Sequence, residues 1–174
     1  IWSLCLTTKE KDTAMKKTHL VMIDPQNDFC DKKGSLFVTG ADADVVRLAA
    51  FIRKNKNRLT EIHCTLDSHD PIHIAHPRFW VNSKGEQPKP FTLITADDVK
   101  NGVWRAFNPQ LQVRAQAYVD ALAKNKRYVL VIWPPHCLIG SWGAAVAPDV
   151  HAALTEWATE SFNRVNWVTK GSNF

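Results

Sequence analysis

The amino-acid sequence predicts an α/β fold: a Rossmann-like three-layer sandwich with a mainly parallel sheet flanked by helices. Four short apolar runs have the length and composition of strands, namely His19–Ile23, Leu59–Leu66, Tyr128–Ile132 and Val165–Thr169. Stretches with helical periodicity separate the runs, and this alternation is typical of parallel sheets. A residue suited to acid–base or metal chemistry stands at or just past the end of each run. In open sheets of this class, ligands bind beyond the carboxyl ends of the strands.

Three helices are predicted between these runs. Apolar residues recur at i, i+3, i+4 and i+7 over Ala41–Asn57, between Pro109 and Asn125, and again after Pro148. This spacing gives each helix one apolar face, which we expect to pack in the core. Residues 78–108 interrupt the alternation with turn-forming residues and prolines, and Phe91–Thr95 is a candidate extra strand. We interpret 78–108 as an insertion near the site.

The composition favours one intracellular domain. A chain of 174 residues that is 45% hydrophobic is long enough for one buried core. Its apolar runs are far shorter than the roughly 20 residues that span a bilayer, and its N-terminus lacks a signal-peptide core. The cysteines lie far apart without a C-x-x-C pair, so we expect no disulfide framework. These features predict a cytoplasmic protein without a membrane partner.

The charge and the chain ends add further expectations. The net charge of +5 comes from small basic clusters. Two of them lie at predicted helix ends, where cations complement the helix dipole, so no nucleic-acid partner is expected. Residues 1–14 precede Met15 and are expected to be a non-native or disordered extension of a domain spanning 15–174. The predicted sheet is C-terminally incomplete, and a second copy of the chain is a candidate for completing it.

One segment, Leu66 to His76, has the residue types of a metal site. Asp67 and His69 stand at the end of a predicted strand, His73 and His76 follow closely, and His136 comes from a later strand end. Carboxylate and imidazole together suit Zn²⁺, Mn²⁺ or Fe²⁺, and such mixed sets usually leave a coordination position open for catalysis. His19, His63 and His151 are expected to be ordinary strand and helix residues.

Two more residues are candidates for acid–base chemistry. Asp24 follows the first strand in an Asp-Pro turn, where a carboxylate is placed to act as a general base. Lys170 follows the last predicted strand. A partly buried lysine near an aspartate and a thiol favours the thiolate, which is how cysteine nucleophiles are activated.

Four motifs together resemble those of nicotinamidases, within the isochorismatase-like cysteine hydrolases. They are DPQNDF at 24–29, LDSH at 66–69, WPPHC at 133–137 with IGSWG behind it, and VTKGSN at 168–173, and the similarity covers roughly residues 15–174. The resemblance implies a Cys-Asp-Lys triad that cleaves a carboxamide through a thioester, with a divalent metal ion that anchors the pyridine nitrogen of the substrate.

The resemblance assigns a role to each matching position. Asp24 matches the triad base and Lys170 the triad lysine. Phe29 and Trp133 match aromatic residues that sandwich the nicotinamide ring. The metal ligands correspond to Asp67, His69 and His136, with an extra loop histidine that is His73 or His76; we prefer His73.

The resemblance also leaves alternatives. In nicotinamidases the nucleophilic cysteine follows the lysine, after a further strand, so the sequence matches the N-terminal part of such an enzyme. Cys30, Cys64 and Cys137 are poor substitutes for that cysteine. The long insertion leaves the exact amide open. A hydrolase of another substrate, such as isochorismate, and a non-catalytic metal-binding domain remain the alternatives to a nicotinamidase-like amidohydrolase.

Overall fold

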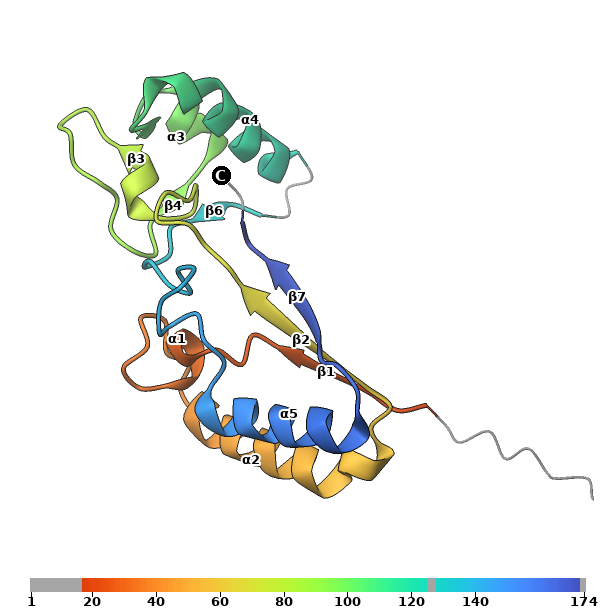
Figure 1. Ribbon diagram of the computed structural model, residues 1–174. Coiled ribbons are helices and arrows are strands. Elements are labelled where there is room, and N and C mark those ends of the chain that lie inside the picture. Colours follow the sequence, from red (N-terminus) through yellow and green to blue (C-terminus); the bar gives the residue numbers. More distant parts are fainter. Residues whose placement is uncertain (1–16, 125–127, 173–174) are drawn as a thin grey trace, which may run out of the picture.

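The computed structural model describes residues 17–124 and 128–172, and its centre is a parallel sheet. Three strands form the sheet in the order β1 (His19–Ile23), β2 (Glu61–Asp67) and β7 (Asn166–Lys170), as Figure 1 shows. The register places His19 opposite Glu61 at one end and Asp67 opposite Lys170 at the other. The predicted α/β class, with a mainly parallel sheet flanked by helices, is confirmed.

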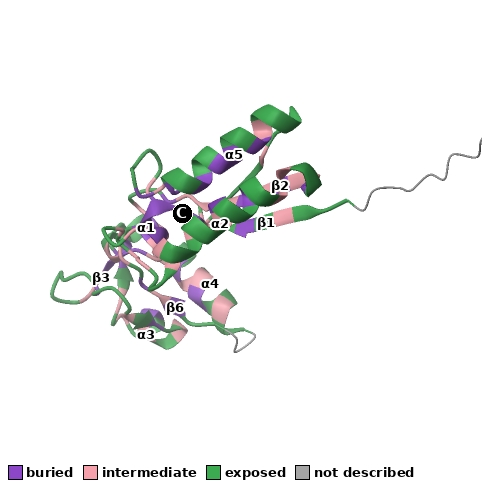
Figure 2. Cartoon of the chain, turned by 90° about the horizontal axis from the view of Figure 1, so that it is seen from below, coloured by how far each residue is buried: buried purple, intermediate pink, exposed green. Residues whose placement is uncertain are grey.

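Two long helices lie side by side on one face of the sheet. They are α2 (Ala41–Asn55) and α5 (Pro148–Ser161), both at the predicted positions (Figure 1). Helix α2 ends slightly before the predicted Asn57, where a 3-10 turn over Lys56–Arg58 follows. Figure 2 shows buried stripes along α2 and α5, while their outer surfaces are exposed. The apolar residues that recur with helical spacing in the sequence therefore form the buried face of each helix.

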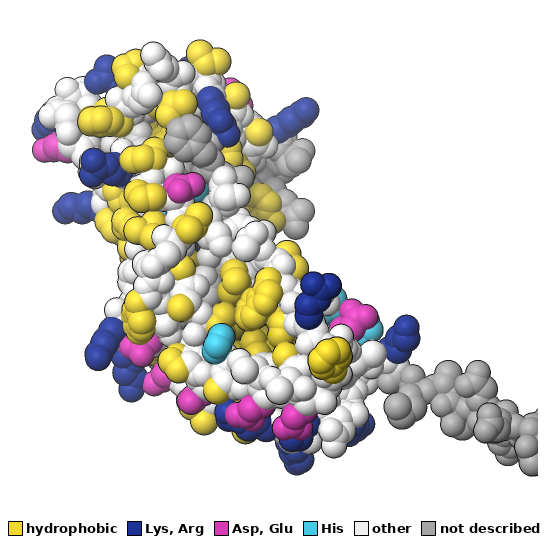
Figure 3. All heavy atoms as spheres, viewed as in Figure 1, with side chains coloured by type: hydrophobic (Ala, Val, Ile, Leu, Met, Phe, Trp, Pro, Cys, Tyr) yellow, Lys and Arg dark blue, Asp and Glu magenta, His cyan; other side chains and the backbone are white. Residues whose placement is uncertain are grey.

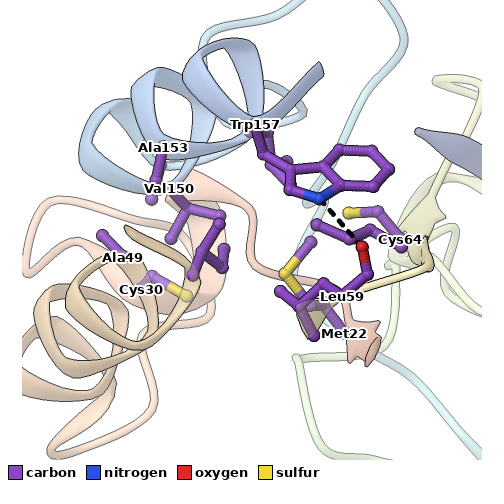
Figure 4. Packing of buried hydrophobic residues seen from close by; sticks show 12 residues of the cluster. Met22, Cys30, Ala49, Leu59, Cys64, Val150, Ala153 and Trp157 are labelled. Carbon is purple, nitrogen blue, oxygen red and sulfur yellow. Dashed lines mark hydrogen bonds between the residues drawn. The ribbon is translucent and has the colours of Figure 1, made fainter. Parts of the chain in front are cut away.

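The first hydrophobic cluster fills the space between these helices and the sheet. Trp157 of α5 is its largest side chain, and the indole nitrogen donates a hydrogen bond to the carbonyl oxygen of Leu59 at 3.4 Å (Figure 4). Met22 and Cys64 come from the strands, and Ala49 comes from α2. Because alternate strand residues point to opposite faces, Val21 and Ile23 lie on the other face, where they are 61% and 74% exposed. The sequence predicted a sandwich of three layers. The described residues form two of them, the sheet and this helix pair.

A second hydrophobic cluster lies beyond the carboxyl ends of the strands. Trp80, Ile94 and Val119 are among its buried residues. The segment 77–131 builds this part from short elements: β3 (Trp80–Val81), β4 (Leu93–Ile94), α3 (Ala96–Lys100), β5 (Arg105–Ala106), α4 (Gln112–Ala123) and β6 (Leu130–Val131), with 3-10 turns at Pro77–Phe79 and Pro109–Leu111. Of the candidate strand over Phe91–Thr95, only Leu93–Ile94 forms a strand, β4.

The predicted strand Tyr128–Ile132 does not belong to the parallel sheet, which corrects our expectation of four parallel strands. Only its central part forms β6, which pairs antiparallel with β4. The amide of Ile132 also donates to the carbonyl of Thr92 at 2.9 Å, and its side chain is buried in the second cluster. An apolar run indicates a buried strand without indicating its partner, so local sequence could not distinguish these two pairings.

Several expectations concern features outside this arrangement. Among the described helices, none is long and apolar enough to cross a membrane. The expected extension, residues 1–14, lies outside the described residues. The cytoplasmic location, the partners and the status of 78–108 as an insertion stay predictions.

Trp157 provides a test of the core. We expect Trp157→Ala to lower the free energy of unfolding by about 3–5 kcal/mol, because a fully buried indole leaves a cavity that the helix pair cannot close. Urea unfolding followed by circular dichroism measures the change. Trp142, which is 52% exposed in a loop, is the matched control, and Trp142→Ala should cost about 1 kcal/mol or less. Equal losses in the two variants would contradict this packing.

Candidate functional site

The carboxyl ends of the three strands bring two acids and a lysine together. Asp24 follows β1, Asp67 ends β2 and Lys170 ends β7. The ammonium nitrogen of Lys170 lies 2.7 Å from Oδ2 of Asp24 and 2.5 Å from Oδ1 of Asp67. The structure therefore places these three predicted site residues at one rim of the sheet.

The backbone holds Asp24 in an unusual conformation. Its φ of +51° lies in the left-handed region, which residues other than glycine seldom adopt. Its amide donates to Thr65 of the neighbouring strand, and the Thr65 hydroxyl donates to Oδ1 of Asp24 at 2.6 Å. This hydrogen bonding leaves Oδ2 to face Lys170 and the space beyond the strand ends.

The charges at this rim support one another. Burial alone would raise the pKa of the Asp67 carboxyl, but contacts with two imidazoles and with the Lys170 ammonium hold that pKa well below its usual range. Burial alone would lower the pKa of Lys170, yet the two carboxylates raise it above its ordinary value. Lys170 is therefore held as an ammonium group that bridges Asp24 and the Asp67 carboxylate.

Two histidines point their Nε2 atoms at the other oxygen of Asp67. Nε2 of His69 and Nε2 of His136 each lie 3.6 Å from Oδ2 of Asp67. Nδ1 of His69 lies 2.6 Å from the carbonyl oxygen of Gly171, and Nδ1 of His136 lies 2.7 Å from that of Pro134. Since a carbonyl only accepts hydrogen bonds, both Nδ1 atoms carry a proton. In a doubly protonated ring Nε2 also donates to Asp67, whereas in a neutral ring Nε2 has the free lone pair that a metal ion would need.

Gly171 is required for this placement of His69. Its φ is +81°, and a Cβ atom built at this position would lie 2.6 Å from Cε1 of the imidazole. Any side chain would therefore strain the backbone and push His69 away from Asp67.

The other two histidines of the segment are buried beside His69. The ring centroids of His73 and His76 lie 4.4 and 5.2 Å from that of His69. Burial, and then the neighbouring imidazoles, lower the pKa of His73 to about 4 and that of His76 to about 3. Nδ1 of His73 accepts a hydrogen bond from the amide of Ala75, whereas Nε2 of His73 and both ring nitrogens of His76 have no hydrogen-bond partner. Buried polar atoms without protein partners are uncommon, and a bound ion or water usually satisfies them.

A cavity of about 420 Å³ joins these groups. Its lining includes Asp24, Asp67 and all four of these histidines. The aromatic residues Phe29 and Trp133 also line it, and the ring of Phe29 meets that of His136 edge-on at a centroid distance of 5.4 Å. All the predicted site residues thus line the cavity or, in the case of Lys170, bond to residues that do.

The sequence analysis missed two residues that hold the site together, Gln26 and Asp28. The fully buried side chain of Gln26 accepts from the amide of Asp67 and donates to the carbonyls of Asp67 and Ala144, all at 2.8–2.9 Å. The signal available in the sequence was a run of polar residues, Gln-Asn-Asp, shortly after the first predicted strand. Such residues are buried only when they are hydrogen-bonded.

Asp28 anchors the loop that carries His136. One carboxylate oxygen accepts from the amide and hydroxyl of Ser35, and the other accepts from the amide of Cys137 at 2.6 Å. Burial alone would raise the pKa of Asp28, but these hydrogen bonds lower it below its ordinary value of 3.8. Gly143 approaches the carboxylate so closely that a Cβ atom there would overlap it.

The thiols of the described residues are poorly suited to nucleophilic attack. Cys30, Cys64 and Cys137 are all buried. Burial raises the pKa of each thiol, in the case of Cys64 to about 12. Since the thiolate is the nucleophile, these thiols are inert at neutral pH, in agreement with the sequence-based expectation.

Comparison with known proteins gives structural likeness without sequence matches. No protein-family model and no curated protein sequence matches the chain. The structure of the yeast nicotinamidase bound to the inhibitor nicotinaldehyde is similar, with a TM-score of 0.57 and 19% identity over 88% of this chain and 56% of that chain. A second structure of the yeast nicotinamidase has a TM-score of 0.54 at the same identity and coverage. A pyrazinamidase of Pyrococcus horikoshii in complex with zinc has a TM-score of 0.43 and 18% identity, over 88% of this chain and 51% of that chain.

The two likenesses to the yeast nicotinamidase show the fold. The chain has the α/β fold of the yeast nicotinamidase and spans about half of that enzyme's length. The resemblance that the sequence motifs indicated is thus confirmed at the level of the fold.

Asp28 gives a test of the loop anchor. We expect Asp28→Asn to lower the free energy of unfolding by about 1–3 kcal/mol at neutral pH, because an amide nitrogen replaces one of the two accepting oxygens. The folded pKa lies below the ordinary value of 3.8, so the carboxylate's contribution is full above that value and is lost as the pH falls through the folded pKa. Urea unfolding at pH 7 and pH 3 should show the difference between the two proteins shrinking.

The exposed Asp70 is the matched control for this comparison, and Asp70→Asn should leave the stability nearly unchanged at both pH values. A difference between wild type and Asp28→Asn that grows toward low pH would refute the assignment.

Proposed function

We propose that the chain forms the metal-binding and acid–base part of a nicotinamidase-like amidohydrolase, which converts nicotinamide or a related carboxamide to the acid and ammonia. The observation that carries this proposal is the cavity in which the Asp24–Lys170 pair and the Asp67–histidine cluster face each other. An acid–base pair alone would suit many reactions. Its placement beside a set of metal-type donors and two aromatic rings suits a flat, nitrogen-containing amide.

The donor set fits a divalent metal ion, in our proposal Zn²⁺, Mn²⁺ or Fe²⁺. Asp67, His69 and His136 would hold it, since the tautomers of both imidazoles leave Nε2 free and the carbonyls behind them fix the ring orientation. When bound, the ion would supply a coordination position for the pyridine nitrogen of the substrate.

A fourth ligand would come from His73 or His76. The sequence-based preference for His73 stays a prediction. His76 offers two ring nitrogens without hydrogen-bond partners, whereas one nitrogen of His73 already accepts from Ala75. Both rings stay neutral at neutral pH because burial lowers their pKa values, and a neutral imidazole is the form that binds metal.

Phe29 and Trp133 would hold the substrate ring. Both line the cavity beside the histidines, and the indole of Trp133 is 38% exposed toward solvent. Flat aromatic side chains on a cavity wall bind a flat ring by stacking or edge contacts.

In the reaction we propose, Asp24 accepts the proton of a cysteine thiol and Lys170 stabilises the resulting thiolate by its positive charge. The thiolate attacks the amide carbon, Asp24 returns the proton to the amide nitrogen, and the C–N bond breaks to release ammonia. Water then hydrolyses the thioester to the acid and the free thiol. The three described thiols are buried with raised pKa values, so we assign the nucleophile to a cysteine outside the described residues.

The same burial of thiols favours one alternative, a non-catalytic metal-binding domain. Hydrolysis by the natural full-length protein separates the two candidates. A panel of nicotinamide, other carboxamides and isochorismate also separates a nicotinamidase from a sibling hydrolase.

The metal proposal predicts the behaviour of four variants. We expect Asp67→Asn and His136→Ala to weaken Zn²⁺ binding by about 100-fold or more, since loss of even an outer partner of a ligand costs about 10–100-fold. Competition with a chelator measures the affinity. Of His73→Ala and His76→Ala, the variant that lacks the fourth ligand should show the larger loss.

His151 lies exposed on α5 and serves as the control, so His151→Ala should bind as wild type does. Unchanged affinity in both Asp67→Asn and His136→Ala would rule out this metal site.

The catalytic proposal is tested by ammonia release from nicotinamide with the natural full-length protein. We expect Asp24→Asn and Lys170→Ala to lower kcat by about 10²–10⁴-fold, the usual contribution of a positioned acid–base group. Asp97→Asn and Lys84→Ala, both at exposed positions, are the matched controls and should keep the wild-type rate. A wild-type rate in Asp24→Asn would defeat the mechanism.

A further inference from the structure

A second group of metal-type donors lies at the opposite end of the sheet from the cavity. His19 begins β1 and Glu61 begins β2, and the register places these two residues opposite each other. His63 lies two residues after Glu61, so its side chain points to the same face of the sheet. This is the face without α2 and α5, where side chains are open to solvent. In Figure 3, histidine and acidic side chains lie together at the end of the sheet where β1 begins.

The three donor atoms face one another. Nδ1 of His19 lies 3.6 Å from Oε2 of Glu61, and Nε2 of His63 lies 3.3 Å from the same oxygen. The two ring nitrogens lie 3.5 Å apart, and the rings stack with an interplanar angle of 12°. The strand pairing thus forms a triangle of two nitrogens and one oxygen.

The size of this triangle matches a metal site. In a tetrahedral ion with bonds of about 2.0–2.1 Å to nitrogen or oxygen, neighbouring donor atoms lie roughly 3.3–3.4 Å apart. The three separations here are 3.3, 3.5 and 3.6 Å. An ion above the triangle would therefore be within reach of all three atoms once the two stacked rings turn their lone pairs toward it.

The surroundings also suit a bound ion. The side chains of His19, Glu61 and His63 are 42%, 43% and 31% exposed, so an ion can enter from solvent and a water molecule can fill the fourth position. Two imidazoles and one carboxylate suit borderline ions such as Zn²⁺.

We propose that His19, Glu61 and His63 form a second, surface-exposed binding site for a divalent transition-metal ion such as Zn²⁺. Glu61 and Asp67 stand at opposite ends of β2, about 20 Å apart at the rise of an extended strand. The second site is therefore distinct from the cavity, and it stands whether or not the cavity binds metal.

Equilibrium dialysis against Zn²⁺, followed by metal analysis, tests this proposal. We expect wild type to bind one more Zn²⁺ per chain than Glu61→Gln or His63→Asn, and Asp67→Asn to retain the second site. His151→Asn, which changes an exposed histidine elsewhere, should leave the number of bound ions unchanged.

Circular dichroism verifies that each variant is folded. Should a variant fail to fold, anomalous scattering at the zinc edge from wild-type crystals grown with Zn²⁺ decides the question instead. A peak between His19, Glu61 and His63 is expected there. Equal zinc content in wild type and both folded variants, or no anomalous peak at this position, would overturn the proposal.

Discussion

Lys170 lies between the carboxylates of Asp24 and Asp67, and the rest of the candidate site depends on this bridge. Both carboxyl groups lie within 2.7 Å of the Lys170 ammonium nitrogen, so this one cation compensates both of them. Parallel pairing of β1, β2 and β7 supplies that cation, because it ends the three strands at one rim. One oxygen of Asp67 is then used by Lys170, and the other is left for the two imidazoles.

The buried polar residues after β1 connect this rim to the loop that carries His136. Gln26 bonds to both backbone groups of Asp67, and Asp28 bonds to the amide of Cys137. Strand β2 and the 136–145 loop are far apart in sequence, and these side chains add to the backbone hydrogen bonds that His69 makes with Cys137 and Ile139 in joining them. A fully satisfied buried network of this kind is rigid, which keeps the donors of the cavity at fixed separations.

Burial distinguishes the two histidine clusters along β2. The cluster beyond its carboxyl end is buried, and burial lowers the pKa values of His73 and His76 so that these rings are neutral donors at neutral pH. The cluster at its amino end is exposed on the face that α2 and α5 leave open. The first cluster suits a ligand enclosed by the second hydrophobic cluster and the strand ends, and the second suits an ion taken directly from solvent.

The sequence by itself determined the α/β class, the three strands of the sheet, the long helices and the residue types at the strand ends, because apolar periodicity and strand ends are local features. It also indicated Asp24, Asp67 and Lys170 as neighbours, since parallel strands end at one rim. Only the tertiary structure decided that Leu130–Val131 pairs with β4, that Gln26 and Asp28 brace the loops, and that His19 faces Glu61 and His63. Each of these contacts depends on which segments pair and in what register. Register is set by two distant segments together, so it cannot be read from the sequence of either segment alone.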